Sequence, residues 1–236
     1  MSKEEAARIK LQKPQGKVYA FFIDFKRAFP SISHNLLWKK LSVLGVSYKL
    51  INVLISLYQN AIMLIKNQHG TSKPIEITEG LLQGEILSPL LFSLFISDLE
   101  NFLRLKGIRG ISISKLTEIL LHAYADDIVV VSNSPALMKR ILKAHREYWS
   151  INQLVVNIKK TNIVIFSKGG KQRKETFYFG EEKVEIIKKY TYLGIAFVGS
   201  ALFEVATKEM FSKASLASSS TINHIKNTLL ATSLKN

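Results

Sequence analysis

Apolar and polar positions along this chain follow two different periods. Uninterrupted apolar runs, such as the six residues 18–23, have the length and composition of buried strands. The stripe formed by Met138, Ile141, Leu142 and His145 has instead the spacing of a helix with one side in the core. The pattern predicts helices near 34–43, 47–58, 88–105 and 135–150, and strands near 18–24, 61–67, 74–78, 154–157, 162–166, 176–179, 182–187 and 191–197.

Two short apolar segments enclose the tetrapeptide Tyr124-Ala125-Asp126-Asp127. The segment before it and the segment after it both have the character of strands, so we expect a hairpin of buried strands over 119–132 with the acids at its tip. Antiparallel strands with helices on one face make an α+β fold. A chain of 236 residues, 47% of them hydrophobic, can bury one good core.

Three of the chain's four aspartates stand where a metal site would form. Asp126 and Asp127 lie at the hairpin tip, and Asp24 ends the first predicted strand. Mg²⁺ prefers hard carboxylate oxygens, and two such ions a few Å apart hold the attacking and leaving oxygens of a phosphoryl transfer. The Asp-Asp pair alone leaves open an ordinary solvated turn. The fourth aspartate, Asp98, is expected to be a solvated or capping residue of the 88–105 helix.

Five segments along the chain carry a further signal, and they are FIDFKRAF at 22–29, LLQGEILSPL at 81–90, YADD at 124–127, VNIKKT at 156–161 and YTYLG at 190–194. Their order and spacing are similar to those of motifs in the reverse transcriptase family. Over about residues 17–197 the chain resembles the enzymes of non-LTR retrotransposons of the long interspersed element type. The resemblance implies a polymerase palm with an antiparallel sheet backed by helices.

The resemblance implies a centre that transfers nucleotides with two Mg²⁺ ions, for which Mn²⁺ is an alternative. Lys160 would act as the general acid that helps pyrophosphate leave, although Lys159 is equally well placed in the sequence. The metal ligands that it implies are Asp24, Phe25 through its carbonyl, Asp126 and Asp127.

A nucleotide pocket and a primer grip are implied as well. Phe29 would lie under the incoming sugar and exclude a 2′-hydroxyl, while the residue pattern alone is equally that of a core phenylalanine beside a turn. Ser88 and Pro89 predict a helix start, as N-cap and first helical residue, just after this pocket. The primer grip would be the turn Tyr192, Leu193 and Gly194. The nucleotide-binding residues would be Arg27 and Ala28 through their backbone N–H groups, Phe29, Gln83, Gly84 and Tyr124.

The charge of the chain predicts a polyanionic partner. The net charge is +15, and residues 133–236 carry 17 basic against 7 acidic side chains. Such a surface binds phosphates without reading bases, which suits an RNA template and a DNA primer alongside deoxynucleoside triphosphates. A merely solubilising basic surface is the alternative. The absence of cysteine and of a membrane-spanning apolar run predicts an intracellular protein, in the nucleus or cytoplasm, with no membrane partner.

The predicted organisation is a palm with incomplete surroundings. We expect a basic segment at 1–16, the palm with partial fingers (34–85) over 17–197, and a tail or start of a thumb at 198–236. Pro30 stands where the family usually has aspartate. Because the surroundings of the palm are incomplete, the chain is expected to be a fragment of a longer polyprotein. It is expected to be poorly active without the missing fingers, thumb and endonuclease. A catalytically inactive palm that binds nucleic acid and a group II intron maturase are the alternatives.

Overall fold

The computed structural model describes residues 17–68, 70–82, 84–112, 114, 117–167 and 175–199. These residues form two units. The larger unit contains residues 18–163 and 175–185, and the smaller contains 164–167 and 186–199 together with residue 17. The predicted segment 1–16 and residues 200–236 of the predicted segment 198–236 lie outside the described residues.

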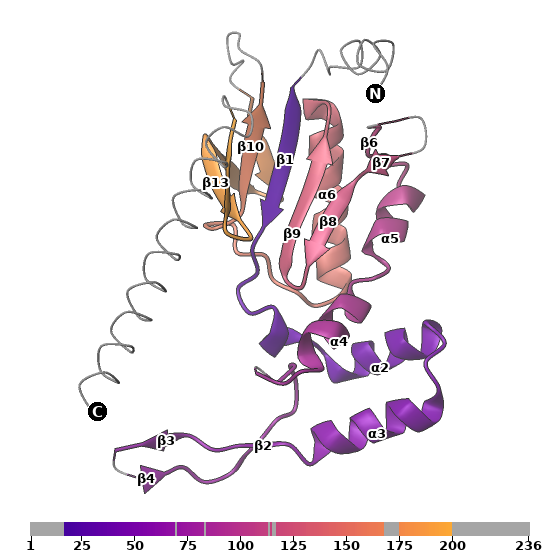
Figure 1. The fold of residues 1–236 in the computed structure, drawn as a ribbon, viewed down its shortest axis with the longest axis vertical. Helices are drawn as coiled ribbons and strands as arrows, with labels where there is room; N and C mark the ends of the chain where they lie inside the picture. The colour runs from indigo at the N-terminus through magenta and orange to yellow at the C-terminus, as the bar shows by residue number, and fades with distance from the viewer. Residues whose placement is uncertain are drawn as a thin grey trace, which may run out of the picture. The chain divides into compact units, whose positions relative to one another are not determined.

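A six-stranded sheet is the centre of the larger unit (Figure 1). Its strand order is β11-β12-β10-β1-β9-β8, and both β10 and β12 begin in this unit. The pairs β1–β9, β8–β9 and β11–β12 are antiparallel. The strands are β1 (Val18–Ile23), β8 (Leu121–Tyr124), β9 (Asp127–Ser132), β10 (Asn162–Phe166), β11 (Phe177–Phe179) and β12 (Glu182–Ile187).

Burial along these strands agrees with their place in the sheet. Residues 19–23 of β1 are all buried, as its uninterrupted apolar sequence predicts for a central strand. The expectation of two buried strands in the acidic hairpin is wrong for β8, whose last three residues are exposed. β8 is the outermost strand in the order, so only its partner β9 alternates between buried and more exposed positions.

Helix α6 (Pro135–Ile151) covers one face of the sheet and contacts β1, β9 and β11 (Figure 1). Its start is well defined, because the Ser134 hydroxyl accepts a hydrogen bond from Leu137 N–H and Pro135 opens the first turn. The predicted amphipathic stripe is confirmed. The buried residues of α6 are Met138, Ile141, Leu142, Ala144, His145, Tyr148 and Trp149.

The single helix predicted over 88–105 is wrong. The structure has α4 (Ser88–Phe95) and α5 (Leu99–Leu105), separated by a turn at 96–98. Within this turn the Ser97 hydroxyl donates to the carbonyl of Leu94, a local bond that competes with helix continuation.

The turn also gives Asp98 a structural role, so the expectation of a solvated or capping residue is wrong in part. The Asp98 side chain is half exposed and makes no cap bond to α5. It accepts hydrogen bonds from Lys40 Nζ, at 2.7 Å, and from the Tyr148 hydroxyl. Lys40 belongs to α2 (His34–Val43), so this cluster joins α2 and α6 through the turn between α4 and α5.

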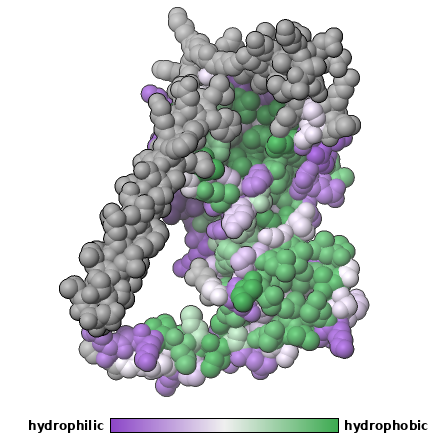
Figure 2. Space-filling view, in the orientation of Figure 1, coloured by the Kyte–Doolittle hydropathy of each residue, from purple (hydrophilic) through white to green (hydrophobic). Residues whose placement is uncertain are grey.

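Beyond α3 (Tyr48–Gln59) the chain forms a narrow two-stranded arm over 61–76 (Figure 1). The longer strands predicted near 61–67 and 74–78 are reduced to two-residue pieces that are exposed throughout. Figure 2 shows apolar side chains gathered on the surface around α2–α4 and along this arm. The arm strands are β2 (Ile62–Met63), β3 (Lys66–Asn67), β4 (Gly70–Thr71) and β5 (Ile75–Glu76).

Smaller elements complete the description. The 3-10 turn η1 (Phe29–Ser31) follows β1, and the short pair β6 (Ile111–Ser112) and β7 (Glu118–Ile119) precedes β8. In the smaller unit, β13 (Lys189–Tyr192) and β14 (Ile195–Val198) form a hairpin where a single strand over 191–197 was predicted. In the part of the chain that the structure describes, no helix is long and apolar enough to span a membrane.

Candidate metal and nucleotide site

The pairing of β1 with β9 brings two of the predicted metal ligands to the same end of the sheet. The last pair of this ladder is Ile23 with Ile128. Asp24 directly follows Ile23, and Asp127 directly precedes Ile128. Continuing the register by one residue would place the two acids opposite each other and on one face of the sheet.

Asp126 lies in the tight turn between β8 and β9. Tyr124 pairs with Asp127, so Ala125 and Asp126 form a two-residue loop, as the sequence predicts. Ala125 has a φ of +52°, a left-handed conformation that costs a residue with a side chain about 1–2 kcal/mol. Backbone strain of this kind is concentrated at functional loops, where the surrounding structure enforces it.

Asp127 is affected by the charges of the other two carboxylates. The pKa of Asp127 is raised, first by burial and then by the negative charges of Asp126 and Asp24. In Asp24, Oδ2 is buried and has no hydrogen-bond partner among the described residues. A cation beside these oxygens would remove both the repulsion and the unmet hydrogen-bonding capacity.

The structure nevertheless does not show a complete set of metal ligands. Among the described residues, no group of three or more His, Cys, Asp or Glu side chains has the arrangement needed to hold a metal ion. The three-acid site therefore stays a prediction, supported by the strand register and by the effect of the other two charges on Asp127.

The segment that follows α6 holds the backbone of Asp24 and Phe25. The strand predicted over 154–157 is wrong, since only Val156 forms a bridge, and its partner is Phe25. Lys26 N–H donates to the carbonyl of Val155 at 2.9 Å, and Asn157 N–H donates to that of Asp24 at 2.7 Å. These bonds fix the strand end at which the metal ligands are predicted.

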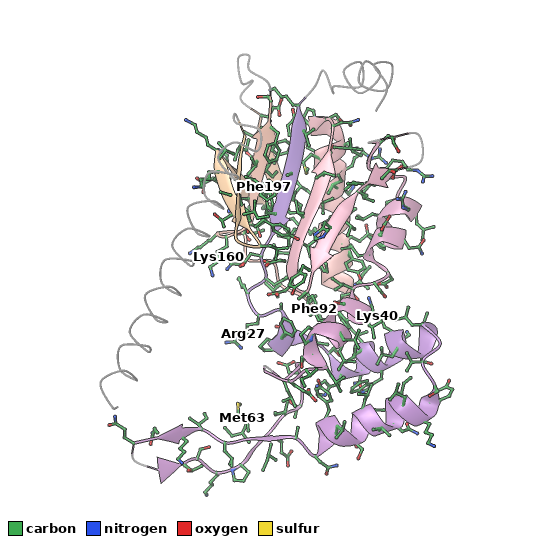
Figure 3. All side chains as sticks on the ribbon, in the orientation of Figure 1. Arg27, Lys40, Met63, Phe92, Lys160 and Phe197 are labelled. Carbon is green, nitrogen blue, oxygen red and sulfur yellow. The ribbon has the colours of Figure 1, made fainter. Side chains whose placement is uncertain are left out.

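Lys160 and Lys159 lie in the turn that follows this segment, and both are exposed. The backbone N–H of Lys160 donates to the Asn157 carbonyl at 3.0 Å, which orders the turn but leaves the side chain unconstrained. In Figure 3 the side chains of Lys160 and Arg27 both extend to the same side of the ribbon, beyond the end of β1. The positions of these residues do not decide which of Lys160 and Lys159 would act as the general acid.

The predicted triphosphate site at Arg27 and Ala28 has free backbone donors. Within the described residues, neither backbone N–H makes a hydrogen bond. Arg27 is exposed, whereas Ala28 is buried. Donors of this kind, in a turn directly after the strand that carries Asp24, are suited to hold an anion.

Phe29 is held in an aromatic cluster that also supports Phe25. The ring of Phe29 is half-buried and stacks on Phe92 of α4, with the centroids 5.1 Å apart. Phe25 meets Trp149 of α6 edge to face at 4.9 Å. Phe29 thus packs against a core residue while remaining partly accessible, and its contact with the incoming sugar stays a prediction.

The loop at 80–84 is bonded to the turn that carries Phe29. Leu81 N–H donates to the Phe29 carbonyl at 2.8 Å. Gly80 has a φ of +89°, and a Cβ there would come within 2.6 Å of the Pro30 carbonyl oxygen, so the close approach requires glycine. Pro30 itself occupies η1, where its missing N–H costs no hydrogen bond.

Two further residues shape this loop. Gly84 is exposed with a φ of +87°, whereas Gln83 lies outside the described residues. The prediction of Ser88 as a helix N-cap is wrong, since α4 begins at Ser88 and its hydroxyl donates to the Leu82 carbonyl at 2.6 Å. That bond holds the loop beside the start of the helix. Tyr124, the remaining predicted nucleotide contact, is 66% exposed at the end of β8.

The predicted primer grip forms the tip of the hairpin in the smaller unit. Tyr192 pairs with Ile195, which leaves Leu193 and Gly194 as a two-residue loop. Both loop residues have positive φ, +48° and +78°, as expected for a type I′ turn. Tyr192 is buried and Leu193 is exposed.

Sequence reasoning missed the role of two residues at this site. Thr161 was seen only as part of a motif, yet it is fully buried and its hydroxyl contacts the backbone of Asp24. Trp149 was assigned to an ordinary core stripe, yet it supports Phe25. No local sequence signal marks Thr161, because its contact with Asp24 joins residues 137 positions apart.

Comparison with known proteins agrees with this geometry. The model of the family described as "Reverse transcriptase (RNA-dependent DNA polymerase)" matches residues 2–197. The chain is 26% identical over 153 residues to the "Retrovirus-related Pol polyprotein from type-1 retrotransposable element R2" of Popillia japonica. It is 29% identical over 119 residues to the "RNA-directed DNA polymerase from mobile element jockey" of Drosophila funebris.

These alignments cover 64% and 50% of the chain but only 25% and 12% of the relatives. The chain therefore spans a quarter or less of the length of these proteins. Both are proteins of mobile elements, in agreement with the expected retrotransposon type.

Solved structures confirm the fold. The chain is similar to apo telomerase from Candida tropicalis, truncated from its C-terminal domain, with a TM-score of 0.56 and 19% identity over 84% of this chain and 39% of that one. Telomerase from Candida albicans in complex with a fragment of telomeric RNA gives a TM-score of 0.54 at 13% identity, over 85% of this chain and 33% of that one. The α+β palm expected from the motifs is thus confirmed, and the chain belongs to the reverse transcriptase family, with relatives among the non-LTR retrotransposons.

Proposed function

We propose that this chain is the palm of a retrotransposon RNA-directed DNA polymerase and joins deoxynucleotides to a primer 3′-hydroxyl on an RNA template. The observation that carries the proposal is the β1–β9 ladder, whose last pair, Ile23 with Ile128, adjoins Asp24 and Asp127 beside the strained turn that holds Asp126. Family membership supports the reaction class.

The donor types present suit divalent cations, whereas among the described residues no group of three or more His, Cys, Asp or Glu side chains is arranged to hold one. The buried Asp24 Oδ2 lacks a partner among the described residues, and burial, followed by the negative charges of Asp126 and Asp24, raises the pKa of Asp127. Asp24, Asp126, Asp127 and the Phe25 carbonyl would hold the ions, which favours Mg²⁺ or Mn²⁺ as cofactor. When bound, such ions stabilise the charge that develops on the attacking and leaving oxygens.

The protein's own groups would position the triphosphate. Arg27 and Ala28 offer backbone N–H donors that are unused within the described residues, and Phe29 presents a half-buried ring beside them. Gly84, on the loop bonded to Phe29, leaves room for close approach. Gln83 and Tyr124 complete the proposed pocket. Lys160 or its neighbour Lys159 would give a proton to the departing pyrophosphate.

The RNA template and DNA primer would be held largely through their phosphates. The net charge of +15 supports binding with little sequence preference, and the Tyr192–Gly194 turn would contact the primer end. Affinity for a primer–template duplex should fall steadily across a salt series. An affinity that does not depend on salt would contradict this electrostatic mode of binding.

Single-nucleotide incorporation tests the catalytic proposal. With protein in excess over an RNA–DNA primer–template and Mg²⁺ present, even a slow rate can be measured. Asp126→Asn should reduce the rate by about 10³-fold, since the metal ions supply several kcal/mol of transition-state stabilisation. Glu100→Gln is the matched control, because Glu100 is an exposed acid paired with Arg104 on α5, and it should leave the rate unchanged.

Two outcomes would contradict the proposal. Equal rates for Asp126→Asn and the unchanged chain would mean that this carboxylate is not a metal ligand. Tight duplex binding with no incorporation under any condition would instead favour a palm that binds nucleic acid without catalysing the reaction.

A further inference from the structure

The Asp24 side chain is oriented without any hydrogen bond of its own. Among the described residues no donor contacts its carboxylate, and Oδ2 is buried. The hydrogen bonds that hold Asp24 all reach its backbone. The groups that make them fix the point from which the carboxylate extends.

The Thr161 hydroxyl contacts both polar groups of the Asp24 backbone. Asp24 N–H donates to Thr161 Oγ1 at 3.1 Å, and the same hydroxyl donates to the Asp24 carbonyl at 3.3 Å. Thr161 is 0% exposed, so no water competes for these bonds. Removing this hydroxyl would leave the polar backbone groups of Asp24 without this partner in a buried place, so losing the contact would cost free energy.

The turn that carries Thr161 is itself held in place. Thr161 N–H donates to the Asn157 carbonyl at 2.9 Å, and Asn157 N–H donates to the Asp24 carbonyl at 2.7 Å. The end of β1 thus has two supports, because β9 pairs with Ile23 and the 157–161 turn bonds to the backbone of Asp24. Two independent backbone attachments define the end of β1.

We propose that Thr161 is a positioning residue, whose hydroxyl fixes the Asp24 backbone so that its carboxylate stands ready for a divalent cation. Thr161 does not touch the ion or the substrates. The inference rests on the proposed function in one respect, since it takes Asp24 as a metal ligand. Outer groups that orient a ligand typically change metal affinity about 10–100-fold when removed.

A purely structural hydroxyl offers a matched control within the same unit. Ser132, at the other end of β9, is also 0% exposed. Its hydroxyl donates to the Ser134 carbonyl at 2.9 Å and accepts from Ser134 N–H at 3.2 Å. Loss of this hydroxyl should lower thermal stability in a similar way but far from the carboxylates.

The test is a titration of the full chain with Mn²⁺ alone, in which free ion is followed by electron paramagnetic resonance, together with thermal unfolding without metal. Thr161→Val, which keeps the shape and removes the hydroxyl, should raise the Kd for Mn²⁺ about tenfold. Thr161→Ser should stay within about twofold of the unchanged chain, since it retains the hydroxyl. Ser132→Ala should lower the melting temperature without changing the Kd.

Asp24→Asn separates failure of this inference from failure of the proposed function. If Asp24→Asn leaves Mn²⁺ affinity unchanged, Asp24 is not a metal ligand and both are wrong. If Asp24→Asn weakens binding while Thr161→Val does not, only the positioning role is wrong. Should Thr161→Val fail to fold, Thr161→Ser is compared with Thr161→Ala, which differ only in the hydroxyl, and equal Kd values would overturn the inference.

Discussion

The end of β1 and the arm at 61–76 belong to the same unit but are held in different ways. At the end of β1, Asp24 and Phe25 are supported by backbone bonds from 155–157, by the buried Thr161 and by the ring of Trp149. Along the arm, the ladders are only two residues long, and Ile62, Met63, Leu64 and Ile65 are all about half exposed.

The contrast shows where tertiary packing stabilises this chain. A two-stranded ribbon without a packed face is marginal in water, whereas the β1 end shares the core with α6. Met63 in Figure 3 extends from the arm with open surroundings, while Phe92 lies within the aromatic cluster. Substitutions in the two regions should therefore differ sharply in their effect on stability.

The largest expected effect separates Trp149 from Leu64. Trp149→Ala should lower the free energy of unfolding by about 3–5 kcal/mol, because it leaves a cavity against Phe25 in the core. Leu64→Ala should change it by about 0.5 kcal/mol or less, as is usual at an exposed position. Urea titration followed by circular dichroism measures both. Equal losses would mean that the arm is packed in solution and the contrast is wrong.

The second expected effect is a dependence of stability on pH, with a smaller change per pH unit than the loss at Trp149. It comes from a buried histidine beside Trp149. His145 is fully buried, neither ring nitrogen has a partner among the described residues, and burial lowers its pKa to about 3 from an ordinary 6.5. Between these two pH values the unfolded chain binds more protons than the folded one. The contribution of the neutral His145 to the free energy of unfolding is therefore fully present above pH 6.5 and decreases on acidification.

The expected loss is up to about 1.4 kcal/mol per pH unit below pH 6.5. Unfolding free energies measured between pH 6.5 and 4.5 should show this slope in the unchanged chain. His145→Phe removes the titrating group but keeps a ring against Phe21, so its slope should be much smaller. Parallel slopes would show that the imidazole is solvated rather than buried.

The smallest expected effect concerns Asp127, whose ionised carboxylate lowers the stability of the folded chain. Its pKa is raised, first by burial and then by Asp126 and Asp24, so the ionised carboxylate is less favourable in the folded chain than in the unfolded one. Asp127→Asn should therefore raise the melting temperature by about 1–2 °C at pH 7 without metal. A decrease would indicate that a favourable contact of this carboxylate outweighs the repulsion.

Sequence periodicity predicted the elements whose burial is continuous. β1 and α6 appear with nearly their predicted bounds, because a run of apolar residues and a helical stripe each specify one environment. The arm strands were overestimated, since an apolar stretch such as 61–65 has the same composition whether or not a core lies beside it. The break at 96–98 depends on Lys40 and Tyr148, which are distant in sequence from Asp98.

The candidate site was predictable where residue type and local turn coincide. Asp24, Asp126 and Asp127 were singled out because each ends a strand or lies in a tight turn, and their joint role as metal ligands stays a prediction. Thr161 was missed because its role exists only through a bond that spans 137 positions of the chain. Ser88 was assigned as a cap from local preference, but the Leu82 carbonyl provides a partner for its hydroxyl.

The register of β1 against β9 limits how the length of this chain can vary. Side chains on a strand alternate between the two faces, so inserting or deleting one residue between Tyr19 and Asp24 would turn Asp24 to the opposite face of the sheet. Substitutions that keep the apolar character would leave that pairing unchanged. The arm carries no such constraint, so related sequences should differ in length there and keep a constant number of residues along β1.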